Sequence, residues 1–352
     1  MKKMLALVLA LSMALGLTAC GGSSSSEASS SGWAGTEAAY PHKSITMIVP
    51  YGAGGTTDLV GRQLAIALGK ALDVSIVVQN QAGASGSIGC QAALDAEPDG
   101  STILFMADSL GTQRVMGLSE LSYNDYSPIM VTANDPKVIV VAPDSPYQTI
   151  EELLAAIQAA PGTIQMAYTG PGGSGHVQAL IMNKFGYEPA LTAYSSGSDG
   201  IVAVMSGQVV FTNSNYSSVA SYIESGDLKM LAVCANERME QHADVPALSE
   251  AMAGSESYMD IPYTPLSLLV HPDVPADVQE MLRAACAQAV QDPDFVAWME
   301  SNNIDKLYEK YTTIDQMKEF YTEWESLVSW MLWEAGAATY SPEDFGIAKP
   351  AN

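Results

Sequence analysis

The sequence predicts an α/β fold with two lobes and a ligand cleft between them. Short apolar runs rich in β-branched residues alternate along the chain with segments that carry a helical stripe of apolar residues. Two glycine-rich loops, which begin after Tyr51 and after Tyr168, each stand between a predicted strand and a predicted helix. After the first 39 residues about 310 remain, which is enough for two domains or one two-lobed body.

The first half of the chain contains the clearest unit of this kind. A strand, a glycine-rich turn, a helix and a second strand form a βαβ unit, which implies a parallel sheet with helices on its faces. A further helix begins among Gly83, Gly86 and Gly89, and a third strand follows it. The predicted strands cover 44–50, 73–79 and 102–106, and the first predicted helix covers 59–72.

The same alternation continues in the second half before the pattern changes. Predicted strands cover 137–142, 163–168, 209–212 and 228–233, and predicted helices cover 150–159 and 177–185. Two long amphipathic helices are predicted near the end of the chain, over 276–291 and 314–334. We expect one discontinuous lobe from 42–142 together with 263–352, and the other lobe from 143–262.

The first twenty residues predict export and a lipid anchor. Lys2 and Lys3 precede an uncharged apolar run, which is shorter than the ~20 residues that cross a bilayer. Leu17-Thr18-Ala19-Cys20 resembles the lipobox of bacterial lipoproteins, and a flexible run of glycine and serine follows. We therefore expect a signal peptide over 1–19, lipidation of Cys20, and a tether over 20–39 that holds the protein to the outer face of the cell membrane. An ordinary cleaved signal, in which Cys20 plays no part, is the alternative.

The composition limits the possible partners. The chain has 39 acidic and 15 basic residues, and loss of Lys2 and Lys3 leaves 13 basic residues and a net charge of 13 − 39 = −26. Such a chain repels nucleic acid and anionic lipid surfaces, so local groups must hold any anionic ligand. Three cysteines remain after Cys20 and none forms a C-x-x-C pair, while the four histidines are scattered. We therefore expect no disulfide framework, no metal site and no cofactor.

The two glycine-rich loops are the candidate binding sites. Consecutive glycines let backbone N–H groups turn inward together, and the following helix adds the positive end of its dipole. An anion can then be held without a cationic side chain. The first loop runs from Gly52 to Asp58 and the second from Gly172 to His176, and neither contains Lys or Arg. A tight turn between strand and helix is the alternative for the first loop.

Common nucleotide and hydrolase motifs do not fit these loops. The first loop lacks the lysine of a P-loop, and Thr57 stands where G-x-G-x-x-G requires its third glycine. In the second loop His176 takes the place of the last glycine of G-x-S-x-G. An extracytoplasmic serine hydrolase that uses Ser174 and His176 remains a second hypothesis, beside a helix-capping serine and a partly buried or ligand-facing histidine.

Several motifs in order resemble the substrate-binding receptors of tripartite tricarboxylate transporters, also called Bug receptors. The resemblance covers residues 42 to 335. Its motifs are Ile45 to Asp58, Val77 to Gly89, Pro98 to Leu104, Gly173 to His176, Met205 to Val209, Leu231 to Val233 and Asp244 to Glu250.

This resemblance implies a two-lobed, periplasmic-binding-protein-like (Venus flytrap) fold whose lobes close on a small organic carboxylate. It implies a receptor and not an enzyme, which delivers its ligand to two integral-membrane permease subunits, and we expect a monomer. When the family's contact positions are transferred to this sequence, the ligand contacts come from both glycine-rich loops. Ser109, Ser214 and Asn215 are weaker candidates. The set is Ala53, Gly54, Gly55, Thr57, Asp58, Ser109, Gly173, Ser174, His176, Ser214 and Asn215.

The chain departs from the family pattern in the second lobe. Ala193 to Ser198 stands where members usually read Pro-Tyr-Lys-Gly, Val210 replaces a common aspartate, and Ser214 stands near the place of another. These changes remove charge from the loops that face the cleft, so the identity of the carboxylate stays open among di- and tricarboxylates, aromatic acids and amino acids. A solute sensor that signals without transport is a third hypothesis.

Overall fold

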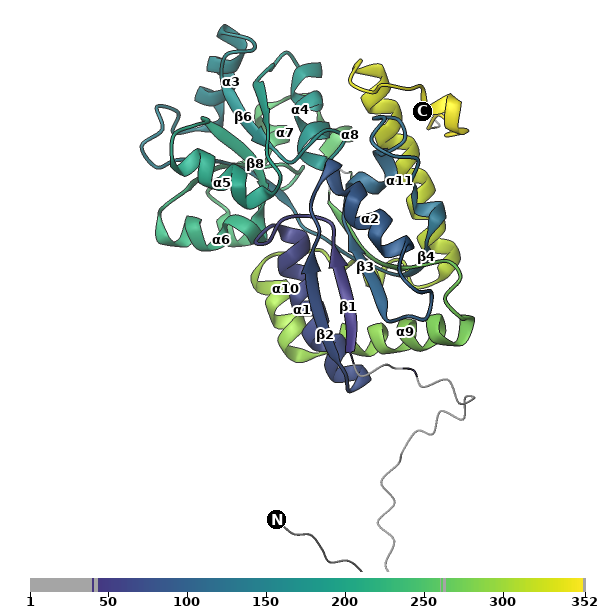
Figure 1. Ribbon diagram of the computed structural model, residues 1–352. Coiled ribbons are helices and arrows are strands. Elements are labelled where there is room, and N and C mark those ends of the chain that lie inside the picture. Colours follow the sequence, from purple (N-terminus) through teal and green to yellow (C-terminus); the bar gives the residue numbers. More distant parts are fainter. Residues whose placement is uncertain (1–39, 41–43, 260, 262–263, 351–352) are drawn as a thin grey trace, which may run out of the picture. The chain divides into compact units, whose positions relative to one another are not determined.

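The computed structural model describes residues 40, 44–259, 261 and 264–350 (Figure 1). The predicted signal peptide, the tether and Cys20 lie outside the described residues. The described chain contains two five-stranded sheets, each covered by helices, so the predicted α/β class is confirmed.

The first sheet has the strand order β2-β1-β3-β10-β4. Its strands are β1 (Ser44–Val49), β2 (Ser75–Asn80), β3 (Thr102–Met106), β4 (Ser127–Asn134) and β10 (Pro265–Val270). The alternation along β1 buries Ile45, Met47 and Val49 together with apolar residues of three helices, and Ile48 on the opposite face packs in another cluster. The helices on the first face are α1 (Thr56–Leu72), α9 (Ala276–Ala289) and α10 (Pro293–Ser301). Those on the second face are α2 (Ser87–Leu94) and α11 (Ile314–Glu334).

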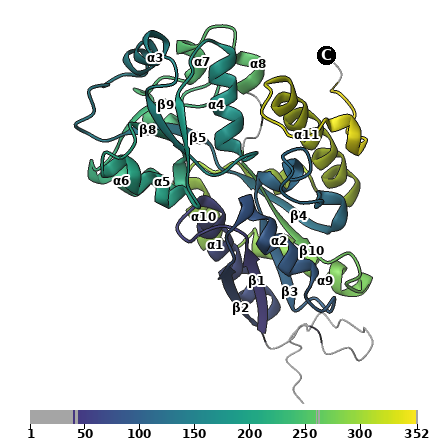
Figure 2. The same ribbon diagram turned by 45° about the horizontal axis from the view of Figure 1, so that its top comes forward.

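The second sheet has the strand order β7-β6-β8-β5-β9. Its strands are β5 (Lys137–Val141), β6 (Gln165–Tyr168), β7 (Ala190–Ala193), β8 (Phe211–Asn215) and β9 (Lys229–Val233). Every residue of β5 is buried, because Val138 and Val140 pack against one pair of helices and Ile139 and Val141 against another. Figure 2 shows these pairs on the two sides of the sheet; they are α5 (Gly197–Met205) with α6 (Tyr216–Ser225), and α3 (Ile150–Ala159) with α4 (Ser174–Lys184). Two one-turn helices, α7 (Leu248–Ala251) and α8 (Glu256–Met259), complete this part.

Local signals explain the helices that were predicted best. Thr149 caps α3 and exchanges hydrogen bonds with Glu152, and Thr313 does the same with Gln316 at the start of α11. Each capping box lies directly before an amphipathic stripe. The bounds of both helices therefore coincide with the predicted ranges.

Three features differ from the sequence prediction. The sheets are mixed instead of parallel, since β10 is antiparallel to β3 and β4, and β5 is antiparallel to β8 and β9. Strands β4, β7 and β10 and helices α5, α6 and α10 were not predicted; β4 and β10 contain prolines that obscure a strand pattern. Strands β2, β6 and β8 each begin two residues later than the predicted strand.

The strand predicted over 137–142 lies in the second sheet, although the sequence analysis assigned it to the first lobe. The chain leaves β4 at Asn134 and passes through Asp135 and Pro136, and then it enters β5 beside β8. Proline at this point cannot donate a backbone hydrogen bond, so it suits a crossing between sheets. The lobe limits as a whole stay a prediction.

Candidate functional site

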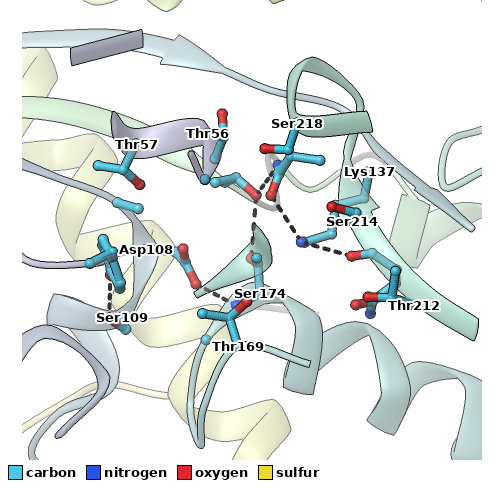
Figure 3. A pocket seen from close by; sticks show the side chains of 18 of the residues that line it. Thr56, Thr57, Asp108, Ser109, Lys137, Thr169, Ser174, Thr212, Ser214 and Ser218 are labelled. Atoms are coloured by element: carbon cyan, nitrogen blue, oxygen red, sulfur yellow. Dashed lines mark hydrogen bonds between the residues drawn. The ribbon is translucent and has the colours of Figure 1, made fainter. Parts of the chain in front are cut away.

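A polar pocket lies where loops of the two sheets meet (Figure 3). Tyr51, Gly52 and Gly55 line it after β1, and Ala107 to Ser109 line it after β3. The second sheet contributes residues of β5 and β8 and the loop after β6. The cavity volume of the pocket is about 60 Å³, and the wider space around it, which includes open solvent, is about 640 Å³. Strands β1, β3 and β6 all point their carboxyl ends at this space, which is where open α/β sheets bind ligands.

Asp58 holds the first glycine-rich loop in shape from inside. Its carboxylate accepts hydrogen bonds from Gly54 N at 2.9 Å and from Asn80 Nδ2 at 2.9 Å, and Arg62 pairs with it at 2.8 Å. Partial burial opposes ionisation, but these bonds from Arg62, Gly54 and Asn80 outweigh it and lower the pKa of Asp58. Gly54 has a φ of 80°, a left-handed conformation that suits glycine. Asp58 and the Gly54 amide are thus engaged with each other, while Gly55 and Thr57 face the pocket.

The second loop is already occupied by a carboxylate of the chain itself. The backbone N–H of Ser174, at the start of α4, donates to Asp108 Oδ2 from the first sheet's side of the pocket. Gly172 N donates to His176 Nδ1 at 3.2 Å, and Thr112 Oγ1 donates to Gly172 O at 2.9 Å. The sequence analysis predicted that the backbone amide of Ser174 binds a ligand, and in this structure that amide binds Asp108.

Ser174 and His176 do not form a nucleophile and its base. The Ser174 hydroxyl accepts a hydrogen bond from Thr264 Oγ1 at 3.3 Å, and His176 Nδ1 accepts the Gly172 amide. Burial lowers the pKa of His176, which suits a neutral ring that closes the loop and packs beside Tyr168. The geometry does not favour the hydrolase hypothesis.

Lys137 is the site residue that the sequence analysis missed. It is 4% exposed, lines the pocket, and donates from Nζ to Asn213 O and to Asn215 Oδ1, each at 3.2 Å. Asn215 donates in turn to Asp135 O at 2.8 Å and to Thr264 Oγ1 at 2.9 Å, so its side chain holds the ammonium in place. In the sequence Lys137 reads as the exposed first residue of an apolar strand, and neither glycine-rich loop is near it.

Asp135 connects the two sheets next to this lysine. Its carboxylate accepts hydrogen bonds from the hydroxyl of Thr56, at the start of α1, and from the hydroxyl of Ser217, at the start of α6. Desolvation by complete burial raises the pKa of Asp135 from 3.8 to about 6, although these hydrogen bonds and the charge of Lys137 oppose the rise. Asp135 stands between β4 and β5, where the chain crosses from one sheet to the other.

We expect this carboxylate to make the protein more stable in mild acid. A folded pKa above the ordinary value means that the folded state binds the proton more tightly, so the contribution is complete below pH 3.8 and is lost as the pH rises through about 6. The difference corresponds to on the order of 3 kcal/mol in the free energy of unfolding. Urea unfolding between these pH values should show that gain in the wild type relative to Asp135→Asn. If the free energy of unfolding changes with pH in the same way in both proteins, the prediction is contradicted.

The predicted contact residues divide into two groups. Those that line the pocket are Gly55, Thr57, Ser109, Gly173, Ser174, Ser214 and Asn215. Those that do not are Ala53, Gly54, Asp58 and His176, and the last three have polar groups engaged within their own loops. Ser214 is notable because it is 6% exposed and its hydroxyl has no hydrogen-bond partner in the described part of the chain. The contacts of all eleven residues with a ligand stay predictions.

No group of three or more His, Cys, Asp or Glu residues in ranges 44–259 and 264–350 is arranged to hold a metal ion. None of the described helices combines the length and the apolar character that a membrane span requires.

Comparison with known proteins relates this chain to one family of receptors. Residues 60–328 match the family described as tripartite tricarboxylate transporter family receptor. The protein BugT of Bordetella pertussis is 30% identical over 216 residues, and the match covers 60% of this chain and 66% of BugT, slightly less than two thirds of its length.

Solved structures agree with the fold. The periplasmic binding protein BugD superimposes with a TM-score of 0.78 at 24% identity, over 85% of this chain and 99% of that chain. MatC of Rhodopseudomonas palustris, solved with bound malate, gives a TM-score of 0.75 at 20% identity, over 83% of this chain and 100% of that chain. At these identities the likeness establishes the fold, and the predicted two-lobed, periplasmic-binding-protein-like architecture is confirmed.

Proposed function

Because this chain belongs to the family of tripartite tricarboxylate transporter receptors, we propose that it captures a small organic carboxylate in the pocket and delivers it to two integral-membrane permease subunits. The family consists of extracytoplasmic solute-binding receptors and not of enzymes. The malate bound to MatC supports a carboxylate as the ligand class here.

The buried ammonium of Lys137 is the observation that carries the proposal. An ion removed from water is costly unless an opposite charge and hydrogen bonds compensate it. Lys137 has hydrogen bonds to two neutral oxygens, and no ion-pair partner lies within 4.0 Å of it among the described residues. A ligand carboxylate in the pocket supplies the missing negative charge.

The start of α1 complements this lysine. Gly55, Thr56 and Thr57 line the pocket at the positive end of a 17-residue helix, where free N–H groups favour an anion. The Ser214 hydroxyl, which is buried without a partner in the described chain, offers one further donor. These groups together provide a cation, a helix end and a hydroxyl for a single carboxylate.

The location of the protein follows from the first twenty residues. We propose that Cys20 is lipidated and that the Ser/Gly-rich tether gives the receptor reach from the membrane to the permease, with the receptor acting as a monomer. Mass spectrometry of the membrane fraction should find a diacylglyceryl group on Cys20. A chain that begins elsewhere and carries no lipid would contradict the anchor while leaving the binding proposal intact.

Calorimetric titration with a panel of di- and tricarboxylates, aromatic acids and amino acids tests the binding proposal. We expect at least one small carboxylate to bind and to raise the melting temperature. Ser214→Ala should weaken that binding about tenfold to a hundredfold, because one hydrogen bond to a charged group is lost. Ser255→Ala is the matched control, since Ser255 is also a buried hydroxyl without a partner among the described residues and does not line the pocket. Failure of every carboxylate to bind would overturn the proposal.

A further inference from the structure

Two opposite charges face the same pocket and come from different sheets. Of the described residues that line the pocket, Asp108 and Lys137 alone carry a formal charge. Asp108 is 5% exposed and follows β3, while Lys137 is 4% exposed and begins β5. Figure 3 shows them on different sides of the pocket, with Ser174 between them.

These two charges do not form an ion pair with each other. No ion pair joins them within 4.0 Å, and in the described part of the chain neither has another ion-pair partner. Each has only neutral hydrogen-bond partners: Asp108 accepts from the Ser174 amide, and Lys137 donates to Asn213 and Asn215. Burial raises the pKa of Asp108 and lowers the pKa of Lys137, while the attraction between their opposite charges opposes both shifts.

Two other carboxylates lie near the pocket. Asp58 pairs with Arg62, and Asp135 accepts from the hydroxyls of Thr56 and Ser217. Neither of these carboxylates lines the pocket. Asp108 is therefore the anionic group that a bound ligand meets.

Asp108 also changes what the second loop can bind. The amide end of α4 would attract a carboxylate by its dipole, as the amide end of α1 does. With the Asp108 carboxylate bound to the Ser174 amide, that end presents a negative charge to the pocket. The pocket then has one side that accepts an anion, at α1 and Lys137, and one side that accepts a cation, at Asp108.

We infer that the ligand carries an ammonium group as well as a carboxylate, as an amino acid does. This inference rests on the proposed function, because it assigns the carboxylate to Lys137 and the start of α1. The ammonium then lies against Asp108. A plain dicarboxylate of the same length places its second negative charge against Asp108 instead, where like charges repel.

Pairs of ligands that differ by one amino group test this inference in the wild-type protein. Calorimetric titration compares aspartate with succinate, glutamate with glutarate, and 2-aminoadipate with adipate at neutral pH. In the pair whose length fits the pocket, we expect the amino acid to bind at least about tenfold more tightly. A dicarboxylate that binds as tightly as its amino counterpart, or more tightly, would overturn the inference and leave the proposed function standing. If no member of any pair binds, and no other carboxylate does, the proposed function itself fails.

The variant Asp108→Asn assigns the preference to this side chain. We expect it to weaken binding of the amino acid about tenfold or more and to leave the dicarboxylate unchanged or bound more tightly, so that the preference disappears. Asp273→Asn is the matched control, because it removes the same charge from an exposed position away from the pocket. A preference that persists in Asp108→Asn would overturn the role of Asp108. The wild-type comparison decides the ligand class even if this variant does not fold.

Discussion

Replacing Lys137 by methionine is expected to weaken carboxylate binding about a hundredfold or more, which corresponds to about 3 kcal/mol. Methionine retains most of the aliphatic stem of lysine, so packing in β5 changes little while the ammonium is lost. The bound carboxylate then lacks its counter-charge, and the oxygens of Asn213 and Asn215 that accepted the lysine protons face it without a donor between them. Calorimetric titration of the ligand identified for the wild type measures the effect.

Lys229→Met is the matched control for this substitution. Lys229 begins β9 of the same sheet and donates to Gln148 Oε1 at 2.9 Å, outside the pocket. The Lys229→Met substitution removes one positive charge, as Lys137→Met does. It therefore measures any long-range effect of net charge on ligand affinity. Equal affinities of Lys137→Met and Lys229→Met would exclude Lys137 as the ligand's counter-charge.

A disulfide between the loops of the two lobes is expected to block ligand exchange. The Ser198 hydroxyl, in the first turn of α5, donates to Ala53 O of the first glycine-rich loop at 2.8 Å, and a Cβ placed on Gly54 would lie 3.5 Å from the Cβ of Ser198. That separation lies within the range of about 3.5–4.5 Å that disulfides span. In the double variant Gly54→Cys and Ser198→Cys, oxidation should fasten the loops and lower the ligand association rate about a hundredfold or more. The left-handed φ of Gly54 makes cysteine there cost about 1 kcal/mol of stability.

Reduction provides the control within the same molecule. We expect a thiol reductant to restore the association rate of the double variant, measured by stopped-flow fluorescence. Each single-cysteine variant should bind the ligand as fast as the reduced double variant does. The native Cys90, Cys234 and Cys286 are buried, so they are poorly placed to react with the new thiols. Unchanged association in the oxidised double variant would show that ligand entry does not require these loops to separate.

The part of the fold that could be predicted from the sequence is the part with local signals. Strand β1, the loop after it and α1 were predicted because alternation, glycine and a helical stripe follow one another directly. Helices α3 and α11 were predicted to the residue because each begins with a capping box. Strand β10 escaped prediction because it pairs antiparallel with strands far away in the sequence, and no local pattern marks that pairing.

The site was predictable to the same extent. The two glycine-rich loops could be assigned to a pocket because open α/β sheets bind ligands at the loops that follow the carboxyl ends of their strands. That Asp108 would occupy the second loop depends on a side chain from a separate segment, and the hold of Asp58 on the first loop depends in part on Asn80 of β2. Lys137 was missed for the same reason, since only the pairing of β5 with β8 brings it beside Asn213 and Asn215.

A crystal structure of the protein with its ligand tests the central claim most directly. The ligand is identified first by mass spectrometry of what co-purifies, or by the titrations described above. We predict a carboxylate within hydrogen-bonding distance of Lys137 Nζ and of the backbone at Gly55 to Thr57, with the Ser214 hydroxyl turned toward the ligand. A ligand bound elsewhere, or one bound in the pocket with its carboxylate directed away from Lys137, would contradict the account.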